Sequence, residues 1–344
     1  MHKRFDVNDS VNFGILGCAK INQVAIIEAA REIPAVQVLA IGSRNPNDAK
    51  QYAADNKIDR SYGSYDALLD DPDIDIVYIP LPNHLHEKWA TRALNAGKHV
   101  LVEKPLAANA EEASRMVKIA QAHSLHLIEA FHYRYHPMTV AILDHLSSGK
   151  IGTIETFQIN LKVPKSLLEP DDIRLSFDCA GGAVMDLGAY GINLLRTIFA
   201  ESPTIDSASA KIVAENIDGS MDIKLRFSND ITGLLSCSIV HDSVESLVTI
   251  RGTKGVLEAK NPFLPQFGNS LKVTVDGTTT KQKFSTTTTY VYQLQAVADL
   301  LLQGKPVTTP GRDGIANMAV LDGIYTAAGL DIRGTTRHGP TVSN

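Results

Sequence analysis

The chain has 344 residues, more than one ordinary hydrophobic core accommodates, so we expect two domains. Its net charge of −5 gives no basic field of the kind that binds nucleic acid or an anionic membrane, so we expect neither as a partner. Cys18, Cys179 and Cys237 are too widely spaced for a CxxC pair or a zinc cluster. We therefore expect no metal site. A polar N-terminus without an apolar core, together with so few cysteines, favours a cytoplasmic setting.

Short apolar runs alternate with helical patterns through the first 130 residues. The expected strands are residues 13–16, 36–41, 76–79, 99–102 and 125–128, and the expected helices are residues 22–31, 64–69, 87–96 and 110–122. Strands that alternate with helices form parallel sheets with crossover helices. This α/β pattern predicts a Rossmann domain with a doubly wound parallel sheet over residues 1–130.

The pattern changes in the remainder of the chain. A strand at 152–163 and a helix at 182–199 precede expected strands at 223–227, 232–240, 247–251, 256–259 and 271–275, and expected helices at 290–303 and 313–328. Closely spaced strands with turn residues between them predict an α+β domain with a large, mostly antiparallel open sheet over residues 131–344. Because such a sheet usually covers its outer face by association, we expect a homodimer or homotetramer.

A glycine turn directly follows the first expected strand. It reads Gly17-x-Ala19-x-x-Asn22, against the dinucleotide fingerprint G-x-G-x-x-G/A. Ala19 adds a methyl group where the backbone must approach a pyrophosphate, and Asn22 departs furthest from the pattern. An ordinary strand-turn-helix has nearly the same sequence, but the position favours a cofactor turn. Gly17, Ala19, Lys20 and Ile21 are the candidate contacts, because a helix N-terminus attracts phosphate.

The second expected strand ends in Ser43-Arg44, where an NAD enzyme generally has an acid for the ribose hydroxyl. A hydroxyl and a guanidinium suit a 2′-phosphate instead, so the sequence favours NADP(H) over NAD(H). Two alternatives remain: Arg44 can be an ordinary surface arginine, or it can stack on the adenine of NAD.

The loop after the strand at 76–79 lies at the carboxyl edge of the sheet, where ligands of this architecture bind. Its candidate cofactor contacts are Pro80, Leu81, Asn83, His84 and His86. Asn83 and His84 can instead cap the following helix. The two histidines have no acid or cysteine at ligand spacing, which argues against a metal.

Glu103-Lys104-Pro105 ends the strand at 99–102, and Pro105 restricts Lys104 to an extended backbone. At this edge a lysine ammonium would orient a substrate hydroxyl and lower the pKa of a neighbouring acid. Glu103 and Lys104 are therefore candidates for the cofactor and substrate site. In isolation, the tripeptide would read as an exposed strand end.

A second polar pair lies on the helix that follows Gly181-Gly182. Asp186 and Tyr190 are four residues apart and share a helix face, which the apolar residues between them indicate to be inward. Stranding a carboxylate and a phenol inside is costly, so both need partners, and Lys104 can serve both. Tyr190 can then exchange the hydroxyl proton while Asp186 positions either Lys104 or a second substrate hydroxyl. The alternative is one acid in a capping turn and one core tyrosine.

Together these motifs resemble the Gfo/Idh/MocA family, named for glucose–fructose oxidoreductase and inositol dehydrogenase. The matching stretches are the Gly17 turn, residues 79–86, 96–105, 129–137 and 181–190. The resemblance implies a Rossmann domain, a second domain with an open sheet, a tightly bound nicotinamide cofactor and an oligomer. It also implies that Lys104 and the helix after Gly181 supply the catalytic group.

Many members of the family have histidine where this chain has Tyr190. The tyrosine form is similar to the branch with glucose–fructose oxidoreductase, NADP-dependent xylose dehydrogenase and dihydrodiol dehydrogenase, which implies that tyrosine is the acid-base and that Arg174 lines the pocket. The candidate substrate contacts are Lys104, His132, Arg134, Arg174, Asp186, Tyr190 and Asn193.

The sequence thus predicts an enzyme that transfers hydride between NADP(H) and a sugar or sugar derivative, by oxidation of an aldose at C1 or reduction of a ketosugar. The alternative is a non-catalytic, dinucleotide-responsive regulator of the same fold. A regulator has no need of Lys104, Asp186 and Tyr190 together.

Overall fold

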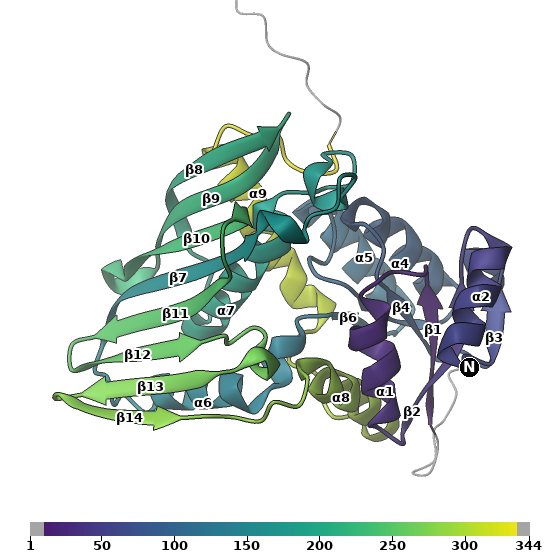
Figure 1. Cartoon of the computed structure of the whole chain (residues 1–344), viewed down its shortest axis with the longest axis horizontal. Helices are drawn as coiled ribbons and strands as arrows, with labels where there is room; N and C mark the ends of the chain where they lie inside the picture. The colour runs from purple at the N-terminus through teal and green to yellow at the C-terminus, as the bar shows by residue number, and fades with distance from the viewer. Residues whose placement is uncertain (1–9, 336–344) are drawn as a thin grey trace, which may run out of the picture. The chain divides into compact units, whose positions relative to one another are not determined.

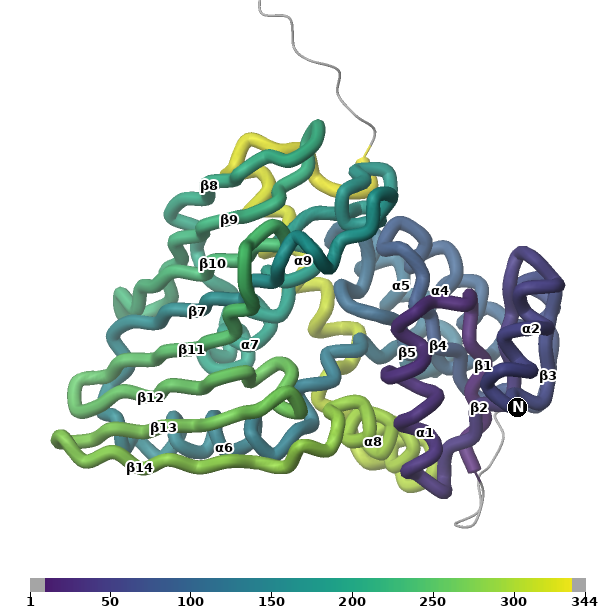
Figure 2. Tube along the Cα trace, viewed as in Figure 1, coloured from purple at the N-terminus to yellow at the C-terminus, as the bar shows by residue number. Residues whose placement is uncertain are grey.

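The computed structural model describes residues 10–335 and divides into two compact units (Figure 1). The first unit comprises the chain up to Ala107, Glu111–Val140 and Ser285–Ile315. The second comprises Ala108–Ala110, Ala141–Phe284 and the chain from Ala316. The chain therefore passes through each unit more than once. In the trace of Figure 2, helix α8 (Thr289–Gln303) lies beside α1 (Glu28–Arg31) within the first unit, although the two are far apart in the sequence.

The first unit is built on a parallel sheet. Its strands are β1 (Val11–Leu16), β2 (Val36–Gly42), β3 (Arg60–Tyr62), β4 (Ile76–Ile79), β5 (His99–Val102) and β6 (Leu127–Glu129). Their order among the described residues is β3-β2-β1-β4-β5-β6, and each neighbouring pair is parallel. The order reverses between β1 and β4, so this is the doubly wound arrangement that the alternation of strands and helices predicted.

Alternate residues of β1 face opposite helical layers. Phe13 and Ile15 belong to a buried core with residues of α1 and α8. Gly14 faces the other way, where a Cβ would lie 2.8 Å from the Leu68 side chain of α3 (Tyr65–Leu69). Helix α4 (His86–Asn95) lies next to α3, since the rings of Tyr65 and Trp89 are 4.7 Å apart. The sheet is therefore covered on both faces, as parallel sheets require.

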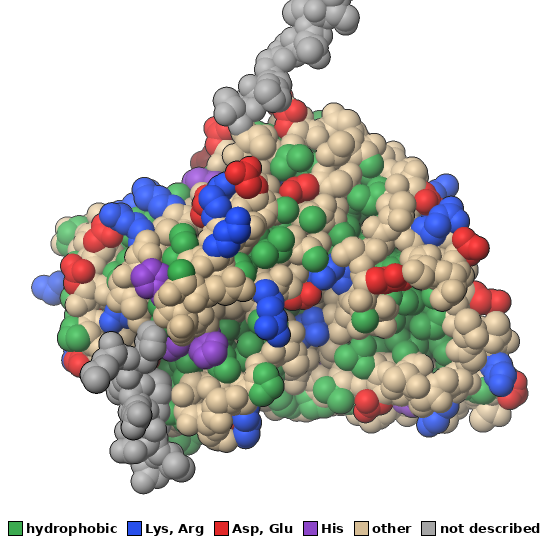
Figure 3. Space-filling model, turned by 180° about the vertical axis from the view of Figure 1, so that it is seen from behind, with side chains coloured by type: hydrophobic (Ala, Val, Ile, Leu, Met, Phe, Trp, Pro, Cys, Tyr) green, Lys and Arg blue, Asp and Glu red, His purple; other side chains and the backbone are tan. Residues whose placement is uncertain are grey.

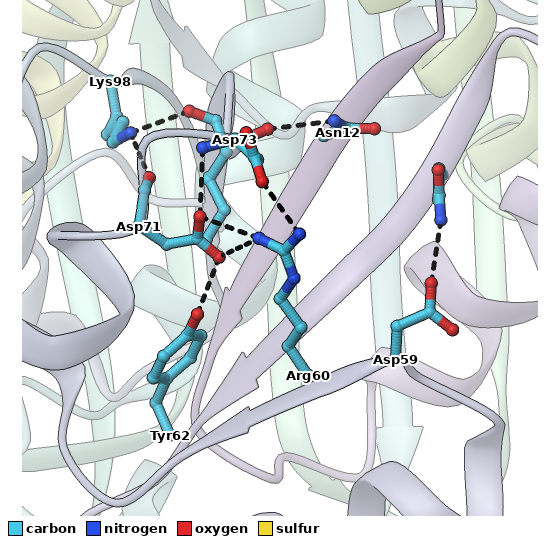
Figure 4. Close-up of polar contacts among 9 residues, drawn as sticks. Asn12, Asp59, Arg60, Tyr62, Asp71, Asp73 and Lys98 are labelled. Atoms are coloured by element: carbon cyan, nitrogen blue, oxygen red, sulfur yellow. Dashed lines mark hydrogen bonds and ion pairs between the residues drawn. The ribbon is translucent and has the colours of Figure 1, made fainter.

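A polar network joins β3 to the segments that precede β4 and β5 (Figure 4). Both oxygens of Asp71 accept from Arg60 Nη1, at 2.9 and 2.8 Å, and the Tyr62 hydroxyl donates to Asp71 at 2.7 Å. Arg60 Nη2 also donates to Asp73, and Lys98 Nζ donates to the carbonyl oxygen of Asp71. Burial raises the pKa of Asp71, but the bonds from Arg60 and Tyr62 outweigh it and the pKa is lowered. The network thus fixes β3 against the segment that precedes β4.

The second unit contains a broad sheet of long strands. These are β7 (Ile154–Pro164), β8 (Thr204–Ala214), β9 (Ile217–Arg226), β10 (Thr232–His241), β11 (Glu245–Gly252), β12 (Gly255–Lys260), β13 (Ser270–Val275) and β14 (Thr278–Gln282). The order is β14-β13-β12-β11-β7-β10-β9-β8 among the described residues, and only the central β7–β10 pair is parallel there. The prediction of a large, mostly antiparallel sheet is confirmed.

One face of this sheet packs against helices. Along β7, Phe157 and Ile159 are buried while Gln158 between them is exposed. The buried face meets the π-helix η6 (Val184–Gly188) and α7 (Ala189–Phe199), since a Cβ on Gly191 would lie 2.5 Å from Leu235 of β10. Helix α9 (Gly311–Ala327) approaches β8, because Gly323 lies close to Ile205. The alternation therefore divides the sheet into a packed face and an accessible one.

Side chains of both charges are mixed on the molecular face drawn in Figure 3, in keeping with a small net charge. On the accessible face of the broad sheet, Gln158 is exposed and its β7 neighbours Asn160 and Lys162 are partly exposed. No helix among residues 10–335 is long and apolar enough to cross a membrane.

Several elements escaped the sequence analysis. Helix α2 (Pro46–Asn56) buries only Ala49 and Ala53, so its apolar face is too small to show as a helical pattern. Strand β14 is exposed at every position, and β3 has three residues. The others are β8 and helix α6 (Pro137–Ser147). Edge strands and small helices bury little apolar surface, so they lack the periodicity on which sequence prediction depends.

Candidate active site

The glycine turn adopts a conformation that requires glycine. Gly17 has φ +91, and its N–H donates to the carbonyl oxygen of Gly42 at 2.8 Å. A Cβ there would lie 3.0 Å from the Leu81 side chain and 3.3 Å from the Tyr65 hydroxyl. Asn22 is fully buried, and its Nδ2 donates to the carbonyl oxygen of Gly17 at 2.8 Å. The residue that departs furthest from the fingerprint therefore holds the turn from inside. Ala19, Lys20 and Ile21 complete the turn before the π-helix η1 (Gln23–Ile27).

Ser43 and Arg44 follow β2 at the same edge. The Ser43 hydroxyl accepts from the N–H of Asn45 at 3.2 Å, and Arg44 is exposed. Burial raises the pKa of the Tyr65 phenol, and the adjacent Arg44 guanidinium opposes that rise. Since Tyr65 also lies against Gly17, the arginine and the glycine turn share one edge of the sheet.

The loop after β4 includes buried Pro80 and Leu81, then a 3-10 turn, η2 (Asn83–Leu85), which exposes His84. His86 is fully buried instead. Its Nδ1 lies 2.9 Å from the carbonyl oxygen of Pro105, and its Nε2 lies 2.8 Å from that of Leu81. Both ring nitrogens face protein carbonyls, so His86 ties the loop to the segment after Lys104. Burial lowers its pKa to about 4, although both carbonyl contacts oppose this.

Glu103 and Lys104 follow β5 at the carboxyl edge. The Tyr78 hydroxyl donates to Glu103 Oε1 at 2.7 Å, and the N–H of Lys104 donates to Oε2 at 3.3 Å. The side chain of Lys104 is partly exposed, and its bond to Pro105 is a cis peptide. Glu103 thus fixes the backbone that carries the lysine.

His132 and Arg134 lie on η3 (His132–Tyr135), which follows β6. His132 is 1% exposed, and its ring centroid lies 4.3 Å from that of Tyr290. Burial, aided by the positive charge of Lys104, lowers its pKa to about 3. A neutral imidazole therefore accompanies the lysine at neutral pH. Arg134 is half-buried.

Two glycines open the helix of the second unit that carries the other candidates. The N–H of Gly181 donates to the carbonyl oxygen of Ser176 and that of Gly182 to the carbonyl oxygen of Arg174, both at 2.9 Å. A Cβ on Gly181 would lie 2.5 Å from the Arg174 oxygen, and Gly182 has φ +123. The Gly-Gly pair is therefore required by a tightly folded turn.

From residue 181 to residue 195, every residue is buried except Asp186 and Tyr190. Both are partly exposed, and the exposed fraction of the Asp186 side chain is 17%, so they are the least buried positions of an inward-packed segment. The apolar residues between them fill the core beneath. Asp186 lies in η6 and Tyr190 in α7, with the Tyr190 ring 5.5 Å from that of Phe263. Asn193 is 1% exposed.

Arg174 and Asp186 form an ion pair. Arg174 Nε donates to Asp186 Oδ2 at 2.8 Å, and its Nη1 donates to both oxygens of Asp172, at 3.2 and 3.0 Å. Asp186, followed by Asp172, raises the pKa of Arg174, so the guanidinium stays charged. Within this unit the cationic partner of Asp186 is therefore Arg174, which the sequence analysis assigned to the substrate pocket.

No group of three or more His, Cys, Asp or Glu side chains that could hold a metal occurs in the described part of the chain. The described cysteines are not in disulfides, and burial raises the pKa of both Cys18 and Cys237.

Comparison with known proteins agrees with this architecture. A model of an oxidoreductase family with an NAD-binding Rossmann fold matches residues 11–131, and the model of the GFO/IDH/MocA C-terminal domain matches residues 140–258. An oxidoreductase from Rhizobium meliloti is 35% identical over 333 residues, which cover 93% of this chain and 97% of the relative. The chain belongs to the Gfo/Idh/MocA family. It is an NAD(P)-dependent dehydrogenase or reductase that acts on CH–OH groups.

Named relatives in the family differ in substrate. D-xylose 1-dehydrogenase (NADP⁺) of Haloferax volcanii is 32% identical over 321 residues, 92% of this chain and 97% of that enzyme. The structure of a 3-ketoreductase from Actinomadura kijaniata in complex with TDP-benzene and NADP has a TM-score of 0.84 at 27% identity, covering 93% of this chain and 98% of the other. Variants of that ketoreductase with a lysine or a tyrosine replaced have also been crystallised.

Sequence reasoning missed the residues that hold the candidates in place. Asn22, Tyr78 and Asp218 are buried; Asn22 bonds a backbone group five residues away, and the other two bond partners 25 and 34 residues away. For Tyr78 the available signal was a polar group within the apolar run of β4, whereas Asp218 lies in a polar stretch of β9 that gave no such signal. Such a signal indicates a buried partner without naming it.

Proposed function

We propose that the chain transfers hydride between NADP(H) and a sugar or sugar derivative, by oxidation of an aldose at C1 or reduction of a ketosugar. The observation that carries this proposal is that, between residues 181 and 195, only Asp186 and Tyr190 are partly exposed, with Arg174 bound to Asp186. A carboxylate and a phenol kept accessible on a rigid element suit recognition of a hydroxyl and exchange of its proton.

The glycine turn has the backbone that a pyrophosphate needs, since Gly17 adopts a conformation closed to other residues. We assign Gly17, Ala19, Lys20 and Ile21 to the pyrophosphate, and Ser43 with Arg44 to the 2′-phosphate. Arg44 is exposed beside Tyr65 at the edge of the glycine turn, which supports this preference for NADP(H). The bound dinucleotide supplies the hydride acceptor or donor. Pro80, Leu81, Asn83, His84 and Glu103 are the remaining contacts, and His86 acts through the backbone that it binds.

Lys104 orients the substrate hydroxyl and stabilises negative charge on its oxygen. Its backbone is fixed by Glu103, and its neighbour His132 is neutral at pH 7, so the lysine is the cation at that position. A fixed positive charge beside a developing oxyanion stabilises the transition state and so lowers the barrier to hydride transfer.

Tyr190 takes the hydroxyl proton during oxidation and returns it during reduction. Asp186, held by Arg174, binds a second hydroxyl of the substrate and fixes its orientation. Arg174 and Asn193, with His132 and Arg134, are the further substrate contacts that we assign. Proton transfer through a positioned side chain contributes typically about 10²–10⁴-fold to a rate.

The sugar class is supported by the named relatives, which include a xylose dehydrogenase, a dTDP-sugar 3-reductase from Saccharopolyspora spinosa and a dihydrodiol dehydrogenase from Xenopus tropicalis. Each name implies a hydroxylated substrate. Side chains rich in hydrogen-bond donors and charge suit such ligands.

We also propose that the accessible face of the broad sheet pairs with a second copy, giving a homodimer or homotetramer. The face carries uncharged polar side chains such as Gln158 and Asn160. Light scattering coupled to size-exclusion chromatography tests this, and a monomer at micromolar concentration would remove it. The domain limits of 1–130 and 131–344 and the cytoplasmic location stay predictions.

The test of the function begins with protein stripped of nucleotide. Calorimetry with NADP(H) and NAD(H) is expected to show tighter NADP(H) binding, which Arg44→Ala reduces and the matched exposed substitution Arg31→Ala does not. A screen of aldoses and ketosugars follows, with Lys104→Met and Tyr190→Phe. Equal affinity for both cofactors would remove the role of Arg44, and wild-type rates in both variants would remove the roles of Lys104 and Tyr190.

A further inference from the structure

Arg333 is the largest fully buried side chain among the described residues, and it lies in the second unit. Its Nη2 donates to Asp218 Oδ1 at 2.9 Å, and both side chains are 0% exposed. Its Nε donates to the carbonyl oxygen of Gly181 at 2.7 Å, and its Nη1 to that of Asp331 at 2.8 Å. The guanidinium carbon also lies 3.8 Å from the centroid of the Tyr325 ring. Every nitrogen of the guanidinium is thus bound.

Asp218, near the start of β9, uses its second oxygen on the candidate helix. Oδ2 accepts the N–H of Val184, the first residue of η6, at 2.8 Å. A carboxylate at a helix N-terminus satisfies a backbone donor that has no partner within the helix. Asp218 thus joins the side chain of Arg333 to the first residue of the helix that carries Asp186.

The ion pair also accounts for the glycine pair. A Cβ on Gly182 would lie 2.1 Å from Asp218 Oδ1, so the carboxylate leaves no room for another residue. Gly181 offers its carbonyl oxygen to Arg333, and Gly182 offers its own to the N–H of Asp186 at 3.0 Å. Gly181 is therefore bound directly to the buried pair. Gly182 lies against the pair and binds the backbone of the helix.

Buried ion pairs seldom increase stability over an apolar replacement, because desolvating two charges offsets their attraction. Here the charges meet backbone groups of one turn, which an apolar pair cannot hold. We propose that the Arg333–Asp218 ion pair positions the helix after Gly181–Gly182 and so sets the direction of Asp186 and Tyr190. Arg333 and Asp218 are positioning residues, and this inference rests on the role given to Tyr190 under the proposed function.

The test is a double-mutant cycle on the full chain. The pair is neutralised as Asp218→Asn with Arg333→Met, in the wild-type protein and in Tyr190→Phe. Removing both charges avoids a stranded buried charge, which is what makes single substitutions in such pairs unfold proteins. The matched control is Asp206→Asn with Arg226→Met, an ion pair of the same sheet whose side chains are 30% and 46% exposed.

We expect kcat to fall about 10- to 100-fold in the wild-type background, because small displacements of a catalytic group are costly. The Kd of NADP(H) stays unchanged. In Tyr190→Phe the same change lowers kcat by a smaller factor, since one of the two groups being positioned is already absent. The control pair leaves kcat unchanged in both backgrounds.

Wild-type kcat in the folded, neutralised variant would overturn the inference, as would an equal loss in both backgrounds. If that variant does not fold, Arg333→Lys decides by the same cycle, because lysine keeps the charge but lacks the guanidinium fork that binds Gly181 and Asp218 together. A Tyr190→Phe protein as active as the wild type would overturn the proposed function as well. Loss in Tyr190→Phe without loss in the neutralised variant removes only the positioning role.

Discussion

Acid should destabilise the first unit through His86. This side chain is fully buried, and its pKa is lowered to about 4. In the unfolded chain a histidine has a pKa of about 6.5. As pH falls below that value the unfolded state takes up the proton first, so stability is full at neutral pH and is lost between about pH 6.5 and pH 4.

The size of the loss follows from the two pKa values. At about pH 4.5 the unfolded histidine is almost fully protonated and the folded one mostly neutral, which corresponds to about 2.5 kcal/mol of lost stability. His86→Gln removes the titration while keeping a polar side chain. The stability gap between wild type and variant should therefore shrink by about 2.5 kcal/mol from pH 7 to about pH 4.5. The His132 contribution is present in both proteins and cancels.

Urea unfolding followed by tryptophan fluorescence measures this gap, because Trp89 is the only tryptophan of the chain and lies one turn beyond His86 in α4. His123→Gln, at an exposed position of the same unit, is the control and should give a gap that does not change with pH. A gap between wild type and His86→Gln that is constant from pH 7 to about pH 4.5 would refute the reasoning, since it would mean that His86 is charged in the folded protein.

Three further outcomes are expected. Asp71→Asn should lower the free energy of unfolding at pH 7 by about 1–3 kcal/mol, because Arg60 and Tyr62 lose an anionic acceptor. Since the pKa of Asp71 in the folded protein is lowered, this difference between wild type and variant should vanish as the pH falls through that pKa. A difference that persists in acid denaturation curves would contradict this. Asn22→Ala should weaken NADP(H) binding measured by calorimetry and cost about 1–2 kcal/mol of stability, with unchanged binding as the contrary result. Arg174→Met should lower kcat/KM for the sugar about 10-fold or more, through loss of the charge that holds Asp186, and an unchanged kcat/KM would remove that role.

The parts of the fold that bury apolar surface were predictable from sequence. Strands β4 and β5 were predicted with their observed limits, since a short, mostly apolar run between turn signals fits a buried parallel strand. Strand β14 was missed because all of its residues are exposed. The sequence predicted the central strands of the broad sheet but not its edge strands, β8 and β14.

The candidate residues were found from motif spacing, but their surroundings were not. The pattern around Asp186 indicated an inward face, and the structure buries the residues between Asp186 and Tyr190 and leaves these two partly exposed. Helical periodicity identifies two faces and cannot say how much of each a neighbouring element covers. Likewise the pairing of Arg333 with Asp218, 115 residues apart, depends on tertiary contact alone.

The central claim is that this chain moves a hydroxyl proton with Tyr190 and Lys104 while hydride is exchanged with NADP(H). The most direct measurement is the single-turnover rate of hydride transfer, followed by nicotinamide absorbance, in wild type, Tyr190→Phe and Lys104→Met with a sugar from the screen. The account predicts rates lower by about 10²–10⁴-fold in each variant with the Kd of NADP(H) unchanged. Hydride transfer at the wild-type rate in either variant would contradict it.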